Sequence, residues 1–179
     1  MNILLFPQEY LTPKYSPTIQ FVFPKYHSYI HVMNKHYISW EEIEVLVNNL
    51  SLKIKNSKTK YKNIFGLQRG GLIPAVMISH QLGIPMDKGD IGPTTIIIDD
   101  ICDSGETLDK LVKDYQTLYA FPFNLNTAVL HYKPHTSCFE PTFHSELYLS
   151  DYWLVYPWEK QDSKTIQDYK IQFGSQQKY

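Results

Sequence analysis

The sequence contains little cysteine, no excess of charge and no long apolar run. Its two cysteines, Cys102 and Cys138, lack the spacing of metal ligands, and a pair is too few for a disulfide scaffold. The net charge of −1 lacks the positive excess that is typical of proteins that bind nucleic acid or an anionic membrane surface. The apolar run Ile3–Phe6 is broken by Pro7, so neither a signal peptide nor a spanning helix is indicated. We therefore expect a soluble, cytoplasmic protein without a nucleic-acid or membrane partner.

Internal repeats and low-complexity tracts are also absent, and the seven histidines are scattered without a metal-binding pair on a helix. A chain of 179 residues fits one domain with room for an appendage, and it can bury a sizeable core. Residues 1–34 form an N-terminal extension in which prolines alternate with aromatic residues, with strand-like content at Thr18–Phe23 and Tyr29–Met33. Residues 35–159 form the main domain, and 160–179 form a polar tail.

Strands and helices alternate along the main domain. Apolar periodicity predicts a helix from Trp40 to Ile54, and Ser39 with Glu42 forms a capping box at its start. The later elements are a strand at 63–67, a helix ending at Leu82, a strand at Thr95–Ile98, a helix at Leu108–Leu118, and strands at Thr127–His131 and Glu146–Leu149. This alternation predicts an α/β fold with a mostly parallel sheet flanked by helices.

Residues 96–108 are the most informative segment of the chain. Three isoleucines lead into Asp99 and Asp100, which predicts a buried parallel strand whose end reaches solvent. The turn Asp103–Thr107 follows and leads into a helix, where free backbone amides favour a phosphate. The two acids suit sugar hydroxyls or a divalent cation. Together these features predict a site for a phosphorylated sugar; the alternative is an acidic loop that caps a helix.

This segment resembles the phosphoribosyl-diphosphate (PRPP) motif of type I phosphoribosyltransferases. The resemblance implies that Asp99 and Asp100 hold the ribose hydroxyls, directly or through Mg²⁺. It also implies that the loop for the 5′-phosphate consists of Ser104, Gly105, Glu106 and Thr107. The acid Asp103 is typical of the branch that uses 6-oxopurines, and there it would take or hold the proton released as purine N9 attacks.

A second turn between a strand and a helix reads Gln68-Arg69-Gly70-Gly71. Its glycines allow close approach of the backbone to a ligand, and the arginine offers a fork of donors to phosphate oxygens. The stretch is similar to the pyrophosphate loop of bacterial xanthine–guanine phosphoribosyltransferases. In that family the peptide before the basic residue is often cis, so the same geometry is expected at Gln68–Arg69.

Three further residues are assigned to the base by the same resemblance. Lys133 follows a strand and matches the lysine that reads the purine 6-oxo group. Trp153 begins a Trp-x-x-x-Pro-Trp-acid signature in which the tryptophan covers the base and the backbone of the next residue, Leu154, helps to read it. Glu159 stands where the family has an aspartate near the magnesium ion, so Asp100 and Glu159 are the candidate metal ligands.

The resemblance covers residues 36–159 and implies a type I phosphoribosyltransferase fold with a small hood. It implies transfer of phosphoribosyl from PRPP to guanine, hypoxanthine or xanthine, with Mg²⁺ as cofactor and a homo-oligomeric assembly. One departure is large: only 86–94 lies where the family carries a further strand and a long mobile loop, and residues 1–34 are the candidate replacement. The alternatives are a catalytically weak or inactive regulatory relative that binds PRPP or nucleotides, and a phosphoribosyltransferase for another base, such as a pyrimidine.

Overall fold

The computed structural model describes residues 34–87, 91–119 and 125–159. By its contacts the chain divides after Val32, and all described residues belong to the unit Met33–Tyr179. The strand-like segments predicted at 18–23 and 29–33 and the tail 160–179 lie outside the described residues. Within the described ranges, no helix combines the length and the apolar character needed to cross a membrane.

Helix α1 (Trp40–Lys55) begins at the predicted capping box. The backbone N–H of Ser39 donates to Glu42 Oε2 at 2.7 Å, and the N–H of Glu42 donates to Ser39 Oγ at 3.2 Å. These two bonds satisfy donors that the first helical turn leaves without partners. The buried face of the helix carries four of the five apolar residues predicted there, Ile43, Leu46, Val47 and Leu50, and Ile54 joins them. The fifth, Trp40 at the first position of the helix, is exposed, so that part of the prediction is wrong.

The central sheet has four parallel strands, β2 (Asn63–Gly66), β3 (Thr95–Cys102), β4 (Asn126–Tyr132) and β5 (Phe143–Leu147), in this spatial order. Helix α2 (Leu72–Leu82) connects β2 with β3, and helix α3 (Glu106–Tyr119) connects β3 with β4. The left-handed Gly83 ends α2, with φ of 67°. The parallel α/β fold predicted from the alternation of elements is confirmed.

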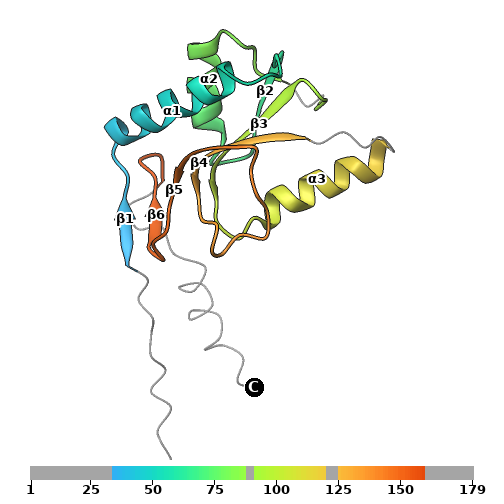
Figure 1. Ribbon diagram of the computed structural model, residues 1–179. Coiled ribbons are helices and arrows are strands. Elements are labelled where there is room, and N and C mark those ends of the chain that lie inside the picture. The colour runs from blue at the N-terminus through green and yellow to red at the C-terminus, as the bar shows by residue number, and fades with distance from the viewer. Residues whose placement is uncertain (1–33, 88–90, 120–124, 160–179) are drawn as a thin grey trace, which may run out of the picture. The chain divides into compact units, whose positions relative to one another are not determined.

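Helices cover both faces of this sheet, α1 and α2 one face and α3 the other (Figure 1). Along β3, Ile96 and Ile98 face the α1 and α2 side, while Ile97 faces α3. A strand buried on both faces needs apolar residues at consecutive positions, which explains the unbroken isoleucine run. The two cores fix the position of the carboxyl end of β3.

A second, two-stranded sheet lies apart from the first. Strand β1 (Lys35–Tyr37) pairs in parallel with β6 (Trp153–Val155), and the N–H of Trp153 donates to the carbonyl oxygen of Asn34 at 2.8 Å. We call β1 and β6 the hood. The hood joins the end of the N-terminal extension to the tryptophan signature near the end of the main domain.

The bounds of two strands, β3 and β5, differ from the sequence predictions by more than one residue. Strand β3 continues past Ile98 to Cys102, because its ladder with β4 extends through Ile101 and Cys102. The two acids thus lie within a strand and not beyond its end. Strand β5 begins at Phe143, earlier than predicted, because its pairing with Ala128 sets its start. In both cases tertiary pairing overrides the local pattern.

The short segment 86–94, which stands where the family has a further strand and a long loop, retains one β-bridge. Met86 forms a parallel bridge with Ile64 on the free edge of β2. The N–H of Ile64 donates to Pro85 at 2.9 Å, and the N–H of Asp87 donates to Ile64 at 2.7 Å. Residues 88–90 lie outside the described part.

Candidate active site

The candidate residues gather at the carboxyl edge of the central sheet. The turn 68–71 follows β2, Asp103 follows β3, and Lys133 follows β4 directly. Because these three strands are adjacent and parallel, their ends meet at one edge, where open α/β sheets place ligands. Segments that are about thirty residues apart in sequence are therefore brought together.

Asp99, which is half-buried, and Asp100, which is buried, form an acidic pair near the end of β3. Only 8% of Asp100 is exposed, and its Oδ1 accepts a hydrogen bond from the N–H of Ile101 at 2.8 Å. Burial, and then the charge of Asp100, raises the pKa of Asp99 to about 8. Burial likewise raises the pKa of Asp100. Two neighbouring carboxyl groups resist ionising together, and a bound cation would relieve this repulsion.

The turn after β2 packs directly against the acidic pair. A Cβ added at Gly70 would overlap the carboxylate of Asp100, and one added at Gly71 would overlap the carbonyl oxygen of Ile98. Only glycine permits so close an approach. The peptide bond Gln68–Arg69 is cis, as the family resemblance predicted, and both of its residues are exposed.

The loop at the start of α3 is held by the segment that follows β4. Gly105 has φ of 77°, and a Cβ there would lie 2.8 Å from the backbone nitrogen of Phe139. The N–H of Cys138 donates to the carbonyl oxygen of Ser104 at 2.8 Å. The side chains of Ser104, Glu106 and Thr107 are exposed beside the first turn of α3. The amides of that turn are suited to an anion.

Asp103 and Lys133 are bonded to each other. The Nζ atom of Lys133, which is only 2% exposed, donates to Asp103 Oδ2 and to the carbonyl oxygen of Tyr152, both at 3.0 Å. Thr136 Oγ1 donates to Asp103 Oδ1 at 2.9 Å. The Asp103 carboxylate thus accepts hydrogen bonds from two side chains that follow β4.

The hood brings the tryptophan signature to the same region. Trp153 is half-buried, and its indole N–H lies buried without a hydrogen-bond partner among the described residues. The side chain of Leu154 is buried in the core. Trp158 stacks on Tyr156 with ring centroids 4.9 Å apart.

Glu159, the other candidate metal ligand, is exposed. Burial, followed by the charge of Asp100, raises the pKa of Glu159, so the two carboxyl groups lie within electrostatic range of each other. In the described ranges no three His, Cys, Asp or Glu residues form a group able to hold a metal ion.

Two residues of this region were missed by the sequence analysis. Thr136 lies in a loop with no recognisable motif, and nothing in the sequence indicates its bond to Asp103. Tyr156 is fully buried, and its hydroxyl donates to the carbonyl oxygen of Asp100 at 3.0 Å. Tyr156 stands inside the tryptophan signature, so its place between Trp153 and Trp158 was the available signal.

The chain was compared with known proteins, and no family model matches it. It is 23% identical over 158 residues to the xanthine-guanine phosphoribosyltransferase of Idiomarina loihiensis, covering 72% of this chain and 89% of that protein. It is 26% identical over 146 residues to the enzyme of the same name from Nitratidesulfovibrio vulgaris, covering 69% of this chain and 84% of that protein.

Solved structures of two phosphoribosyltransferases are also similar. The purine phosphoribosyltransferase of Pyrococcus horikoshii has a TM-score of 0.61 and 29% identity, with 74% of this chain and 99% of that chain covered. The xanthine-guanine-hypoxanthine phosphoribosyltransferase of Helicobacter pylori has a TM-score of 0.59 and 17% identity, covering 70% of this chain and 94% of that chain. The chain thus has the type I phosphoribosyltransferase fold, and its resemblance to the purine branch is confirmed.

Proposed function

We propose that this chain, which has the type I phosphoribosyltransferase fold and resembles the purine branch, transfers phosphoribosyl from PRPP to a 6-oxopurine. The products are the nucleoside 5′-monophosphate and pyrophosphate. The curated relatives support purine phosphoribosyltransferase activity in general. The observation that carries the finer proposal is the Lys133–Asp103 pair, which lies at the same sheet edge as the acidic pair.

PRPP carries two anionic groups, and the site offers two loops for them. The amides at the start of α3, with the hydroxyls of Ser104 and Thr107, suit the 5′-phosphate. The turn of Arg69, Gly70 and Gly71 suits the pyrophosphate, since its arginine is exposed and its glycines leave the backbone open. In the sequence, the acidic pair lies between these two loops. The ribose hydroxyls would bind at this pair.

The acidic pair fits a divalent cation that is shared with the substrate. Mg²⁺ is usually held by one or two carboxylates together with substrate phosphates and water. Asp99 and Asp100 would supply such carboxylates, with Glu159 as a further candidate. When bound, the cation would neutralise charge on the leaving pyrophosphate. Burial, and then the charge of Asp100, raises the pKa of Asp99 to about 8, and a bound cation would lower it again by stabilising the carboxylate.

Base recognition would use the remaining N–H donor of the Lys133 ammonium. An ammonium has three N–H donors, and two of them are occupied by Asp103 and Tyr152. The third can reach the 6-oxo oxygen of a purine, while Trp153 covers the ring. The N–H of purine N7 would then face Asp103, whose carboxylate accepts this hydrogen as N9 attacks the anomeric carbon and pyrophosphate leaves.

A panel of bases tests the assignment of the substrate. The protein is incubated with PRPP, Mg²⁺ and one base at a time, and the nucleotides are separated by chromatography. Guanine, hypoxanthine or xanthine should be converted, whereas adenine and uracil should not, because they do not present the 6-oxopurine pattern to Lys133 and Asp103. Efficient conversion of adenine would overturn the proposed role of the lysine.

A further inference from the structure

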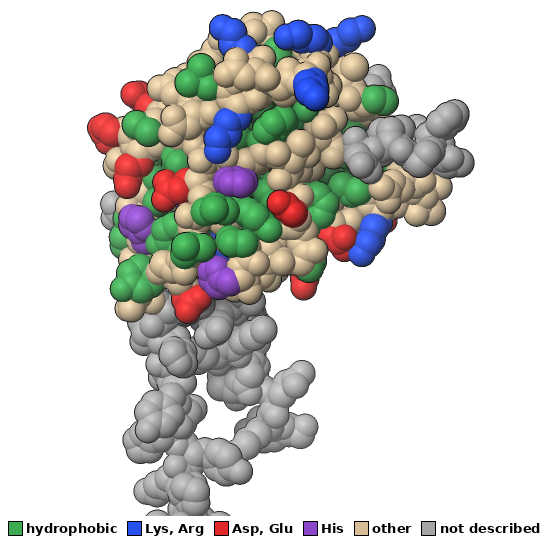
Figure 2. All heavy atoms as spheres, in the orientation of Figure 1, with side chains coloured by type: hydrophobic (Ala, Val, Ile, Leu, Met, Phe, Trp, Pro, Cys, Tyr) green, Lys and Arg blue, Asp and Glu red, His purple; other side chains and the backbone are tan. Residues whose placement is uncertain are grey.

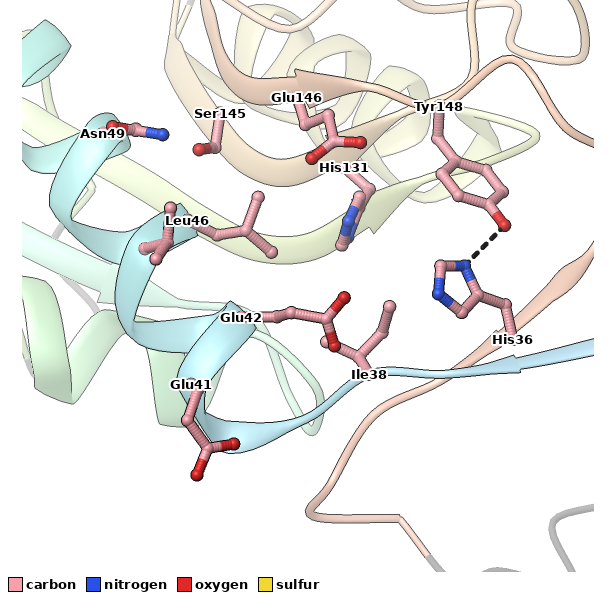
Figure 3. A pocket seen from close by; sticks show the side chains of 11 residues that line it. His36, Ile38, Glu41, Glu42, Leu46, Asn49, His131, Ser145, Glu146 and Tyr148 are labelled. Carbon is pink, nitrogen blue, oxygen red and sulfur yellow. Dashed lines mark hydrogen bonds between the residues drawn. The ribbon is translucent and has the colours of Figure 1, made fainter.

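A cavity of about 530 Å³ lies between the start of α1, the strand β1 and the ends of β4 and β5. Figure 3 shows that its lining combines carboxylates, two imidazoles and aliphatic side chains from these four segments. Its volume is within the range of sites for small molecules. None of the residues proposed above to bind PRPP or the base lines this cavity.

Among the described residues, the lining is acidic and contains no lysine or arginine. Glu41, Glu42 and Glu146 contribute three carboxylates. A hydrogen bond from the backbone of Ser39 lowers the pKa of Glu42, which favours its ionised form. In Figure 2, acidic side chains gather on the side of the molecule formed by α1, with histidines among hydrophobic side chains beside them. This electrostatic environment favours a cation and disfavours a phosphate.

The hydrogen bonds of His131 determine which of its nitrogens faces a ligand. Tyr156 has one hydroxyl proton and donates it to the backbone oxygen of Asp100, so the contact of 2.8 Å with His131 Nδ1 requires Nδ1–H to be the donor. Burial, and then the charge of His36, lowers the pKa of His131 to about 4, so the ring is neutral. Its Nε2 is consequently a bare acceptor.

That acceptor is left without a partner in the described part of the chain. His131 is 3% exposed and lines the cavity, and no hydrogen bond to its Nε2 is found there. A second polar atom in the lining, Ser145 Oγ, is also buried without a partner. Buried polar groups are usually hydrogen-bonded, so Ser145 Oγ indicates a polar group of a ligand in the cavity, and the Nε2 acceptor of His131 belongs to the same lining.

We propose that this cavity is a second binding site, separate from the sheet edge, for an aliphatic amine. One ammonium or guanidinium group of the ligand lies between Glu42 and Glu146 and donates to His131 Nε2. The hydrocarbon part of the ligand packs on Ile38 and Leu46, which line the same cavity. The ligand is an organic cation and not a metal ion, because the described residues contain no cluster of metal-binding side chains.

Calorimetry with three probes, 1,4-diaminobutane, spermidine and 4-guanidinobutylamine, tests the site in the absence of PRPP. At least one probe should bind saturably with one equivalent per chain. The double variant Glu42→Gln/Glu146→Gln should weaken this binding by at least about tenfold, because two carboxylates near the cation are lost. Glutamine at position 42 still supports the capping box, so the helix start is preserved.

The matched control is Glu44→Gln, which removes one exposed carboxylate of α1 that does not line the cavity. This variant should bind the probe as the wild type does. Nitrogen NMR of the imidazoles should find His131 protonated on Nδ1, with a shift of Nε2 when the probe is added. Absence of saturable binding by all three probes, equal binding by the double variant, or protonation of Nε2 would each overturn the proposal.

Discussion

The ammonium of Lys133 is buried at the end of β4 with an acid on one side and a carbonyl oxygen on another. A buried cation is stable only when its donors have partners, and Asp103 and Tyr152 provide two. This arrangement leaves one donor for a ligand and fixes its direction. It also holds the Asp103 carboxylate beside the base that the lysine would bind, so recognition and proton transfer depend on the same pair.

Replacing Lys133 by alanine should weaken binding of a 6-oxopurine by roughly 1–3 kcal/mol, the usual loss for a charge-assisted hydrogen bond. Affinity for PRPP should change little, because the phosphate loops are untouched. Inhibition by the base and calorimetry with PRPP measure the two quantities separately. Lys110→Ala, which removes an exposed lysine from α3, is the control. Equal losses of affinity for base and PRPP would contradict a role specific to the base.

The acidic pair should determine PRPP binding. Asp99→Asn together with Asp100→Asn keeps the side-chain size but removes both carboxylates from the ribose and the cation. Calorimetry in the presence of Mg²⁺ should then detect no PRPP binding, whereas Asp114→Asn, on α3, should bind as the wild type does. A folded double variant with unchanged affinity would mean that PRPP binds elsewhere.

The turns at the carboxyl ends of β2 and β3 position the site through glycine. Gly70 lies against the acid pair, and Gly105 allows the start of α3 to pack against Phe139. At both glycines the neighbouring atoms lie so close that a side chain would not fit. The anion loops are held by the core elements on both sides, which favours preorganised binding of phosphate groups.

Gly105→Ala should disturb both stability and phosphate binding. Alanine at a φ of 77° is strained by about 1–3 kcal/mol, and its Cβ would also collide with the 137–139 segment. Thermal unfolding and PRPP calorimetry should both report the loss. Gly92→Ala is the matched control, because a Cβ there meets no atom within 4 Å. A Gly105→Ala protein as stable as the control would show that the loop can relax.

The periodicity of the chain predicted the helices and the parallel sheet because these depend on local apolar patterns. The α1 stripe and its capping box are such patterns; the capping box is confirmed, and the stripe is confirmed except at Trp40, which is exposed. The extension of β3 to Cys102 could not be predicted, since pairing with β4 and not local hydrophobicity maintains it. The bond between Thr136 and Asp103 joins residues 33 apart in sequence and has no local signature.

At the scale of the whole molecule, burying the acidic groups of the site on folding makes the free energy of unfolding depend on pH. Folding buries Asp99 and raises its pKa from about 3.9 in an unfolded chain to about 8. The folded state therefore binds more protons than the unfolded state between these values. The free energy of unfolding contributed by Asp99 is fully present below the unfolded pKa and is lost progressively as the pH rises, until the loss is complete just above about 8.

The melting temperature should accordingly fall as the pH rises from about 7 to about 8 and should level off above that pH. The titration of His131 does not affect this range, because its lowered pKa reduces the free energy of unfolding only at more acidic pH. The Asp99→Asn/Asp100→Asn variant should show a smaller fall, because its amides do not titrate. Mg²⁺ with PRPP should stabilise the wild type more at the upper end of the range, where the acids are ionised. An identical pH dependence in wild type and variant would contradict the assignment of the buried charge.

The central claim is that the chain catalyses phosphoribosyl transfer and does not only bind PRPP. The most direct measurement is the simultaneous release of pyrophosphate and formation of nucleotide from PRPP, Mg²⁺ and guanine, with each product quantified against the amount of protein. The proposed function predicts equal amounts of the two products over many turnovers, with none formed by the Asp99→Asn/Asp100→Asn variant. Tight PRPP binding without nucleotide formation from guanine, hypoxanthine or xanthine would contradict it and identify a binding-only relative.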